Sequence, residues 1–155
     1  MANIFFDNSI IFVLTQLVPL LYLLTTALYG VHFFTELPAA GRFKQPALIL
    51  TVLAHIADLG ILTSLEGYRL SYSAYNLMGM VALTLAITYM FIELTTKSDR
   101  TGLFVIGFAA VSELFASVLT VQASGNGPSF TGLGIGVHLI AAIFGFSAVA
   151  IAGLY

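Results

Sequence analysis

The chain contains no cysteine and no tryptophan, and charged residues make up only 8% of its 155 residues. The absence of cysteine excludes disulfides, thiolate metal sites and covalent attachment of haem through a CxxCH motif on this chain. Soluble domains carry about 25% charged residues, so the low charge argues against an ordinary soluble fold. The net charge is −2 and no basic patch is present, which argues against nucleic acid as a partner.

Hydrophobic residues make up 59% of the chain and occur in long continuous runs. A helix needs about 20 mostly apolar residues to cross a bilayer, whereas a membrane barrel would show alternation of polar and apolar residues. The runs therefore predict an all-α fold, a polytopic transmembrane helical bundle in which residues 1–155 form one domain embedded in the lipid bilayer. The expected helices cover residues 9–34, 47–65, 76–94, 103–121 and 130–155. Residues 35–46 are expected to form a loop closed by Pro46, since proline suits the first turn of a helix.

The basic residues are distributed unevenly among the loops that this pattern predicts. Arg42 and Lys44 lie in the first loop, Lys97 and Arg100 in the third, and Arg69 alone in the second. Basic residues concentrate on the cytoplasmic side of membrane proteins. We therefore expect the N-terminus outside and the C-terminus in the cytoplasm, in a multi-pass protein of the bacterial inner membrane or an equivalent energy-transducing membrane.

Two histidines lie within the apolar runs, His55 in the second expected helix and His138 in the fifth. At 1.5 Å per residue both lie at a similar depth, roughly 12–15 Å from the outer surface, whereas His32 lies near the cytoplasmic end of its helix. Ionisable side chains at such depth face the bundle interior, a partner or a cofactor. Two imidazoles on separate helices are what a haem iron needs as axial metal ligands, but structural histidines bonded to neighbouring helices fit the spacing equally well.

Three further polar residues accompany these histidines. Asp58 follows His55 by three residues, on the same helix face, where a carboxylate can orient a ligating imidazole or form a proton relay. Glu113 is the deepest acid in the chain, either a proton site or quinone contact, or a protonated side chain bonded to a neighbouring helix. Asn76 begins the third expected helix and is predicted to cap it.

Three segments, VLAHIADLGIL, YNLMGMVALTLAITYMFIEL and GVHLIAAIFGFSAVAIAGLY, follow one another in this order. In order and spacing the chain resembles the N-terminal half of the cytochrome c assembly family, the CcsA/HemX-like membrane proteins. The resemblance implies that His55 and His138 hold haem b as cofactor, and that Asn76 matches a recurring asparagine at the start of the third helix.

Members of that family continue for several more helices and carry a tryptophan-rich segment that presents haem at the outer surface. This chain has no tryptophan, so the resemblance implies that other membrane subunits supply the missing half and that the chain alone is not an enzyme. Two functions stay open. One is haem handling or membrane electron transfer; the other is a haem-free accessory subunit of a larger respiratory or photosynthetic membrane complex.

Overall fold

The computed structural model describes residues 4–65, 74–122, 145 and 153. These residues form four helices and no strand, which confirms the all-α expectation for this part of the chain. The fifth expected helix, 130–155, lies outside the described residues except for its isolated positions 145 and 153. The four helices are α1 (Ile4–Thr35), α2 (Pro38–Leu65), α3 (Ala74–Thr96) and α4 (Gly102–Gln122).

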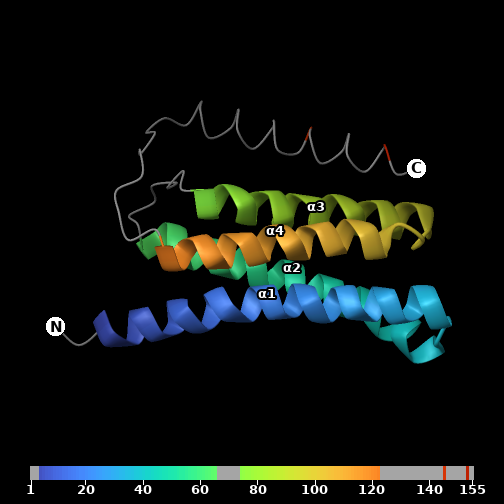
Figure 1. Ribbon diagram of the computed structural model, residues 1–155, viewed down its shortest axis with the longest axis horizontal. Helices are drawn as coiled ribbons and strands as arrows, with labels where there is room; N and C mark the ends of the chain where they lie inside the picture. The colour runs from blue at the N-terminus through green and yellow to red at the C-terminus, as the bar shows by residue number, and fades with distance from the viewer. Residues whose placement is uncertain (1–3, 66–73, 123–144, 146–152, 154–155) are drawn as a thin grey trace.

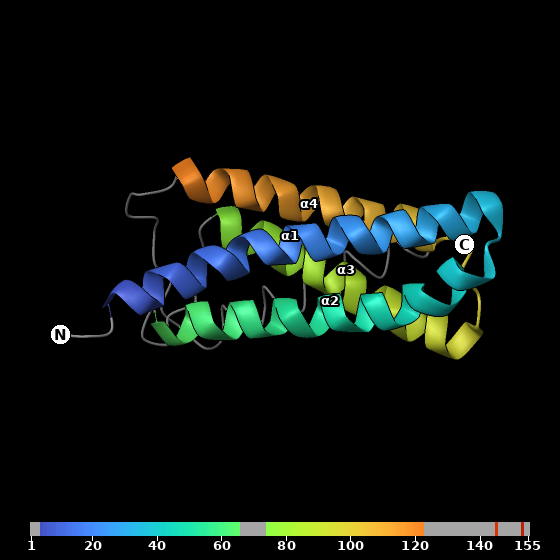
Figure 2. The same cartoon turned by 90° about the horizontal axis from the view of Figure 1, so that it is seen from below.

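The helices run side by side as two hairpins, α1 with α2 and α3 with α4 (Figure 1). Helix α1 also packs along α4, whereas α2 and α3 have the least extensive contact of the neighbouring pairs. The view turned by 90° shows the same four rods lying alongside one another (Figure 2). Both short turns, between α1 and α2 and between α3 and α4, lie at the end of the bundle opposite the N-terminus.

The turn between α1 and α2 is shorter than the sequence predicted. Residues 35–46 were expected to form a loop closed by Pro46, but α2 begins at Pro38 and includes Pro46 in its interior. Proline favours the first turn of a helix because its missing N–H would be unpaired there anyway, and Pro38 takes that place. Pro46 lies eight residues further along, about two turns into the helix. Only Glu36 and Leu37 remain between the helices.

Helices α1 and α3 end in the same way at these turns. Glu36 (φ 52°) and Lys97 (φ 55°) both adopt the left-handed conformation, which usually favours glycine. The amide of Glu36 donates to the carbonyl of His32, and the amide of Lys97 donates to that of Glu93, each at 2.9 Å. These bonds satisfy a carbonyl of the last helical turn and reverse the chain within a few residues.

The other ends differ from the predicted ones by a few residues. Helix α1 begins at Ile4 instead of residue 9, and α3 begins at Ala74 instead of residue 76. Asn76 is therefore the third residue of α3 and not the residue that caps it. The predicted start was two residues too late, since Ala74 and Tyr75 are already helical, and sequence patterns place helix ends only to within about two to four residues.

Small and aromatic side chains fill the space between the helices. Alanines on α3 and α4, among them Ala86 and Ala109, are fully buried, and such small residues let helix backbones approach closely. Three tyrosines, Tyr22, Tyr29 and Tyr89, are the largest fully or almost fully buried side chains. The bundle interior therefore combines close helix packing with hydroxyl groups that need polar partners.

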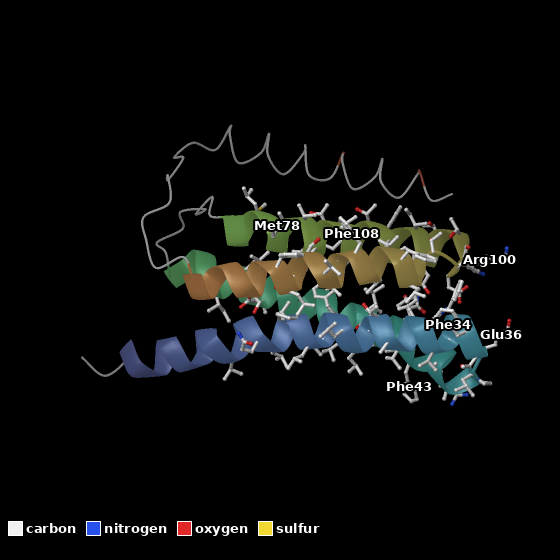
Figure 3. All side chains as sticks on the ribbon, viewed as in Figure 1. Phe34, Glu36, Phe43, Met78, Arg100 and Phe108 are labelled. Carbon is white, nitrogen blue, oxygen red and sulfur yellow. The ribbon has the colours of Figure 1, made fainter. Side chains whose placement is uncertain are left out.

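Large apolar side chains also cover the outside of all four helices. Phe34 is 77% exposed, Phe115 62% and Leu20 61%; Phe34, Phe43 and Phe108 are labelled among the side chains in Figure 3. Two helical segments, Gln16–Thr35 and Leu77–Thr96, are long and apolar enough to cross a membrane by length and composition. A helix that is hydrophobic all round is typical of a membrane span or of the core of a large protein.

Candidate functional site

His55 lies among several polar side chains inside the bundle, on the buried face of α2. Its side chain is 0% exposed. The face is fixed by the spacing of α2, because Thr51, His55 and Asp58 recur at intervals of four and three residues and all are buried. The structure therefore places His55 in the interior of the bundle.

One nitrogen of the His55 ring is held by Tyr22 of α1. The Tyr22 hydroxyl lies 3.0 Å from Nδ1, and the two rings meet edge to face with centroids 5.6 Å apart. One turn away, the hydroxyls of Thr25 and Thr51 lie 2.8 Å apart. These two contacts fix both the rotation and the register of α1 against α2.

The other nitrogen, Nε2, has no hydrogen-bond partner among the described residues. It faces Glu113 of α4, whose Oε2 lies 3.7 Å away, too far for a hydrogen bond. Gly79 of α3 lies beside both atoms: a Cβ at this position would be 3.4 Å from Nε2 and 3.6 Å from the Glu113 oxygen. The missing side chain of Gly79 thus leaves a space about the size of a methyl group next to the unpaired nitrogen.

The two carboxylic acids of this group are buried as well. Asp58 is 1% exposed and Glu113 2%, and Asp58 Oδ1 and Glu113 Oε2 have no hydrogen-bond partner within the described part of the chain. We call Tyr22, His55, Asp58 and Glu113 the histidine cluster. Buried polar atoms are nearly always bonded in folded proteins, so these three unpaired atoms make the cluster the candidate site within the described residues.

The structure differs from the sequence prediction in which side chain bonds to His55. Asp58 shares the face of His55 as predicted, but the side chain bonded to the imidazole is that of Tyr22. The prediction considered only neighbours on the same helix, and a residue of α1 occupies that position. His138 lies outside the described residues, and so does the side chain of Asn76, so neither is brought to the cluster by the geometry described.

A second polar group, which the sequence did not predict, lies nearer the turns. Lys44 of α2 is only 6% exposed. Its ammonium group forms ion pairs with Asp99, in the turn after α3, and with Glu93 at 3.7 Å, and it lies 5.4 Å above the ring of Tyr29. The Tyr29 hydroxyl donates to Glu93, so one buried cation is held by residues of α1, α3 and the following turn.

His32 of α1 completes this group, with its Nε2 3.0 Å from Asp99 Oδ2. The hydrogen bond from Lys44 is the main reason why the pKa of Asp99 lies below its usual value. We call Tyr29, His32, Lys44, Glu93 and Asp99 the loop-end network. Lys44 was expected in a loop; because α2 continues back to Pro38, Lys44 lies on a helix and its side chain is buried.

The spacing of polar residues in α1 could have predicted part of the loop-end network. Tyr22, Thr25, Tyr29 and His32 recur at intervals of three and four residues, which places them on one helix face. The same interval pattern on α2 ends in His55 and Asp58. Two polar faces on neighbouring helices in an otherwise apolar sequence predict that the faces meet.

The chemistry available at the histidine cluster follows from its donors. The described residues contain no group of three or more histidine, cysteine, aspartate or glutamate side chains that could hold a metal ion. A single imidazole nitrogen with an oriented ring and adjacent space can instead provide one ligand to a metal that has further ligands elsewhere, such as a haem iron.

Comparison of the chain with protein-family models, with curated proteins and with solved structures finds no match.

Proposed function

We propose that this chain is a multi-pass membrane protein whose helices cross the bilayer of an energy-transducing membrane. The large apolar side chains on the outside of α1 to α4 support this proposal. In the Gln16–Thr35 and Leu77–Thr96 segments only 28% and 39% of the window is buried, whereas the core helix of a soluble protein would be mostly buried. Lipid is the solvent that suits such surfaces.

The proposed orientation has the two turns in the cytoplasm and the N-terminus outside. Arg42, Lys97 and Arg100 remain exposed at the end where the turns lie, and Arg100 and Glu36 are labelled there in Figure 3. Lys44 no longer contributes to this count, because it is buried between Asp99 and Glu93. Three exposed basic residues against Arg69 elsewhere still favour the cytoplasm for this end.

Within the membrane, we propose that the chain binds haem b through His55, with His138 as the second axial ligand. One observation carries this proposal: the Nδ1 of His55 is bonded to Tyr22 while its Nε2 is unpaired and lies beside the space left by Gly79. A ligating histidine typically has this arrangement, since the nitrogen that does not bind the metal is held by a protein group. Haem bound there would supply one-electron redox chemistry.

The resemblance to the cytochrome c assembly family supports the same cofactor and suggests its use. We propose haem handling or membrane electron transfer as the role of the chain, together with membrane subunits that supply the second half of the family pattern. The described residues leave beside Nε2 only the methyl-sized space at Gly79, so haem would need a wider opening between the helices than this structure has. No enzymatic activity is proposed for the chain alone.

A haem-free accessory subunit is the second candidate, and a specific observation favours it. Glu113 Oε2 lies 3.7 Å from the nitrogen that would bind iron. In a haem-free subunit the imidazole and this carboxyl would form a polar pair that joins α2 to α4. The histidine cluster would then serve only to select the packing of the helices.

Visible spectra of the purified chain and its histidine variants distinguish the two candidates. We expect an α band that sharpens on reduction with dithionite in the wild-type chain, and its loss in His55→Ala and in His138→Ala. His32→Ala is the matched control, because His32 belongs to the loop-end network, and it should retain the band. A colourless wild-type chain, under conditions that load a b-type control protein, would favour the haem-free subunit.

A further inference from the structure

The line along which α2 and α3 face each other, which we call the α2–α3 seam, is the least extensively packed contact between neighbouring helices. Each hairpin, α1–α2 and α3–α4, is closely packed, and α1 packs along α4 and so joins one hairpin to the other. Regions with few packed contacts open at the lowest free-energy cost. Separation of the two hairpins would therefore begin along the α2–α3 seam, with the α1–α4 contact as its hinge.

The loop-end network crosses between the two hairpins at one end of this seam. Lys44 of α2 pairs with Glu93 of α3 at 3.7 Å and with Asp99 in the following turn. From α1, the Tyr29 hydroxyl donates to Glu93, and the His32 ring lies 3.0 Å from Asp99. Each of these four contacts joins a residue of the first hairpin to a residue of the second, and the two made by Lys44 start from α2.

The hydrogen bonds described near the histidine cluster run inside the first hairpin instead. Tyr22 and His55 join α1 to α2 at 3.0 Å, and so do Thr25 and Thr51 at 2.8 Å. The contact between His55 and Glu113 does cross to the second hairpin, but at 3.7 Å it is too long for a hydrogen bond. Among the described contacts, those that attach one hairpin to the other by charge therefore gather near the turns.

Two glycines let aromatic rings of the network pack tightly at this end. A Cβ at Gly41 of α2 would lie 3.0 Å from the His32 ring, and a Cβ at Gly102, the first residue of α4, would overlap the ring of Tyr29. The network therefore occupies a site that the helix backbones are shaped to receive.

We propose that the loop-end network is a clasp that holds α2 against α3, and that the α2–α3 seam opens when the ion pairs of Lys44 are broken. Ion pairs respond to a change of charge, which apolar packing does not. Water reaches the clasp from the turn end, because the Asp99 side chain is 36% exposed, whereas those of Lys44 and Glu93 are only 7% and 8% exposed.

The clasp goes beyond the proposed function and does not depend on whether the chain binds haem. Its consequence for the histidine cluster is access. His55 lies on α2, and Gly79 lies beside its unpaired nitrogen on α3. An opening between these two helices would uncover that nitrogen, which the closed seam keeps buried.

Distances between pairs of spin labels on the full chain in detergent micelles test the proposal. The chain has no cysteine of its own, so labels attach only where cysteines are introduced. Ile56→Cys with Met78→Cys, two exposed positions on α2 and α3 near the level of His55, form the seam pair. Leu24→Cys with Phe108→Cys, exposed on α1 and α4, form the hinge pair.

We expect Lys44→Met to shift the distances of the seam pair to longer values and to leave those of the hinge pair unchanged. Asp99→Asn removes the charge of one of the two carboxylates and should shift the seam pair in the same direction, by less. Arg42→Ala, exposed and two residues before Lys44, is the matched control and should change neither pair.

Unchanged seam distances in a folded Lys44→Met chain would contradict the clasp. Equal lengthening of both pairs would contradict it too, because the network would then hold the whole bundle together and not the seam. If Lys44→Met does not fold, Asp99→Asn decides by the same criterion, and an unchanged seam distance in that variant overturns the proposal. Haem is not part of the readout, so a chain that binds none leaves this test intact.

Discussion

The two polar groups inside this bundle share helices α1 and α2 but differ in how their charged side chains are paired. In the loop-end network Lys44 is held by two carboxylates, and the Tyr29 hydroxyl and the His32 ring are bonded to those same acids. In the histidine cluster, His55, Asp58 and Glu113 each keep one buried polar atom without a hydrogen-bond partner. The comparison teaches that polar groups of similar composition can differ in pairing: the loop-end network joins helices through ion pairs, whereas the histidine cluster leaves atoms that a ligand would pair under the function proposed above.

The physical reason for this division lies in the cost of burial. A buried charge or donor is stabilising only when its partners are in place, and it is destabilising when they are missing. The loop-end network meets that condition for the charged groups of Lys44, Glu93 and Asp99, although His32 Nδ1 has no hydrogen-bond partner among the described residues. The histidine cluster does not meet it within the described residues, so it is expected to lower stability unless a ligand completes it.

Lys44→Met should have the largest effect on stability. The substitution removes the cation that pairs with Glu93 and Asp99 and leaves the buried Glu93 without this ion-pair partner, and such a loss costs about 3–5 kcal/mol. Denaturation in detergent micelles would measure it. Arg42→Ala, two residues earlier and exposed, is the control and should stay within about 0.5 kcal/mol of the wild type; equal losses in both would show that the network does not stabilise the bundle.

Gly102 lies beside the loop-end network and Gly79 beside the histidine cluster, so substitutions at these two glycines test the two polar groups separately. A Cβ at Gly102 would overlap the ring of Tyr29 in the loop-end network, so Gly102→Ala should cost about 1–3 kcal/mol. A Cβ at Gly79 would make an ordinary contact with His55, so Gly79→Ala should fold normally but bind less haem. Thermal melting and haem titration on both variants check this. The reverse pattern, a stable Gly102→Ala and an unfolded Gly79→Ala, would contradict the division of roles.

The pH dependence of stability should come in part from Asp99, with a smaller effect. Its pKa is lowered in the folded state by the hydrogen bond from Lys44, so its contribution is present above the unfolded value of about 3.9. That contribution is lost as the pH falls through the folded pKa. The difference in melting temperature between wild type and Asp99→Asn should therefore shrink between pH 6 and pH 3. If the difference in melting temperature stays constant between pH 6 and pH 3, the Lys44–Asp99 ion pair is not its source.

Glu113→Gln should have the smallest effect on folding. Water is excluded from Glu113 (2% exposed), and burial disfavours a charged carboxylate, so we expect an uncharged side chain that an amide can replace. Expression level and melting temperature should stay near those of the wild type. Loss of expression or assembly would instead indicate an ionised Glu113 paired with His55.

The sequence predicted the helical class and the burial of His55, Asp58 and Glu113, because both follow from composition and apolar runs. It failed at residues 35–46, where Pro46 was read as a helix start although Pro38 already provides one. That error hid the loop-end network, since Lys44 was assigned to a solvent-exposed loop. Helix ends depend on a few local interactions, such as the left-handed Glu36, that hydrophobicity does not encode.

The partners of His55 could not be predicted for a different reason. Tyr22 is 33 residues away in sequence, and Gly79 and Glu113 lie on two further helices. Their meeting depends on the rotation and register of every helix in the bundle. Spacing along one helix identified Asp58 as a neighbour of His55, but it carries no information on which residue of another helix takes the hydrogen bond.

Exchange of the His55 side chain for free imidazole tests the central claim most directly. In His55→Gly the haem α band should disappear, and imidazole added to the purified chain should restore it by occupying the space of the missing ring. His32→Gly should keep the band without imidazole. A His55→Gly chain that retains the wild-type reduced spectrum in the absence of imidazole would show that the unpaired nitrogen of His55 is not a haem ligand.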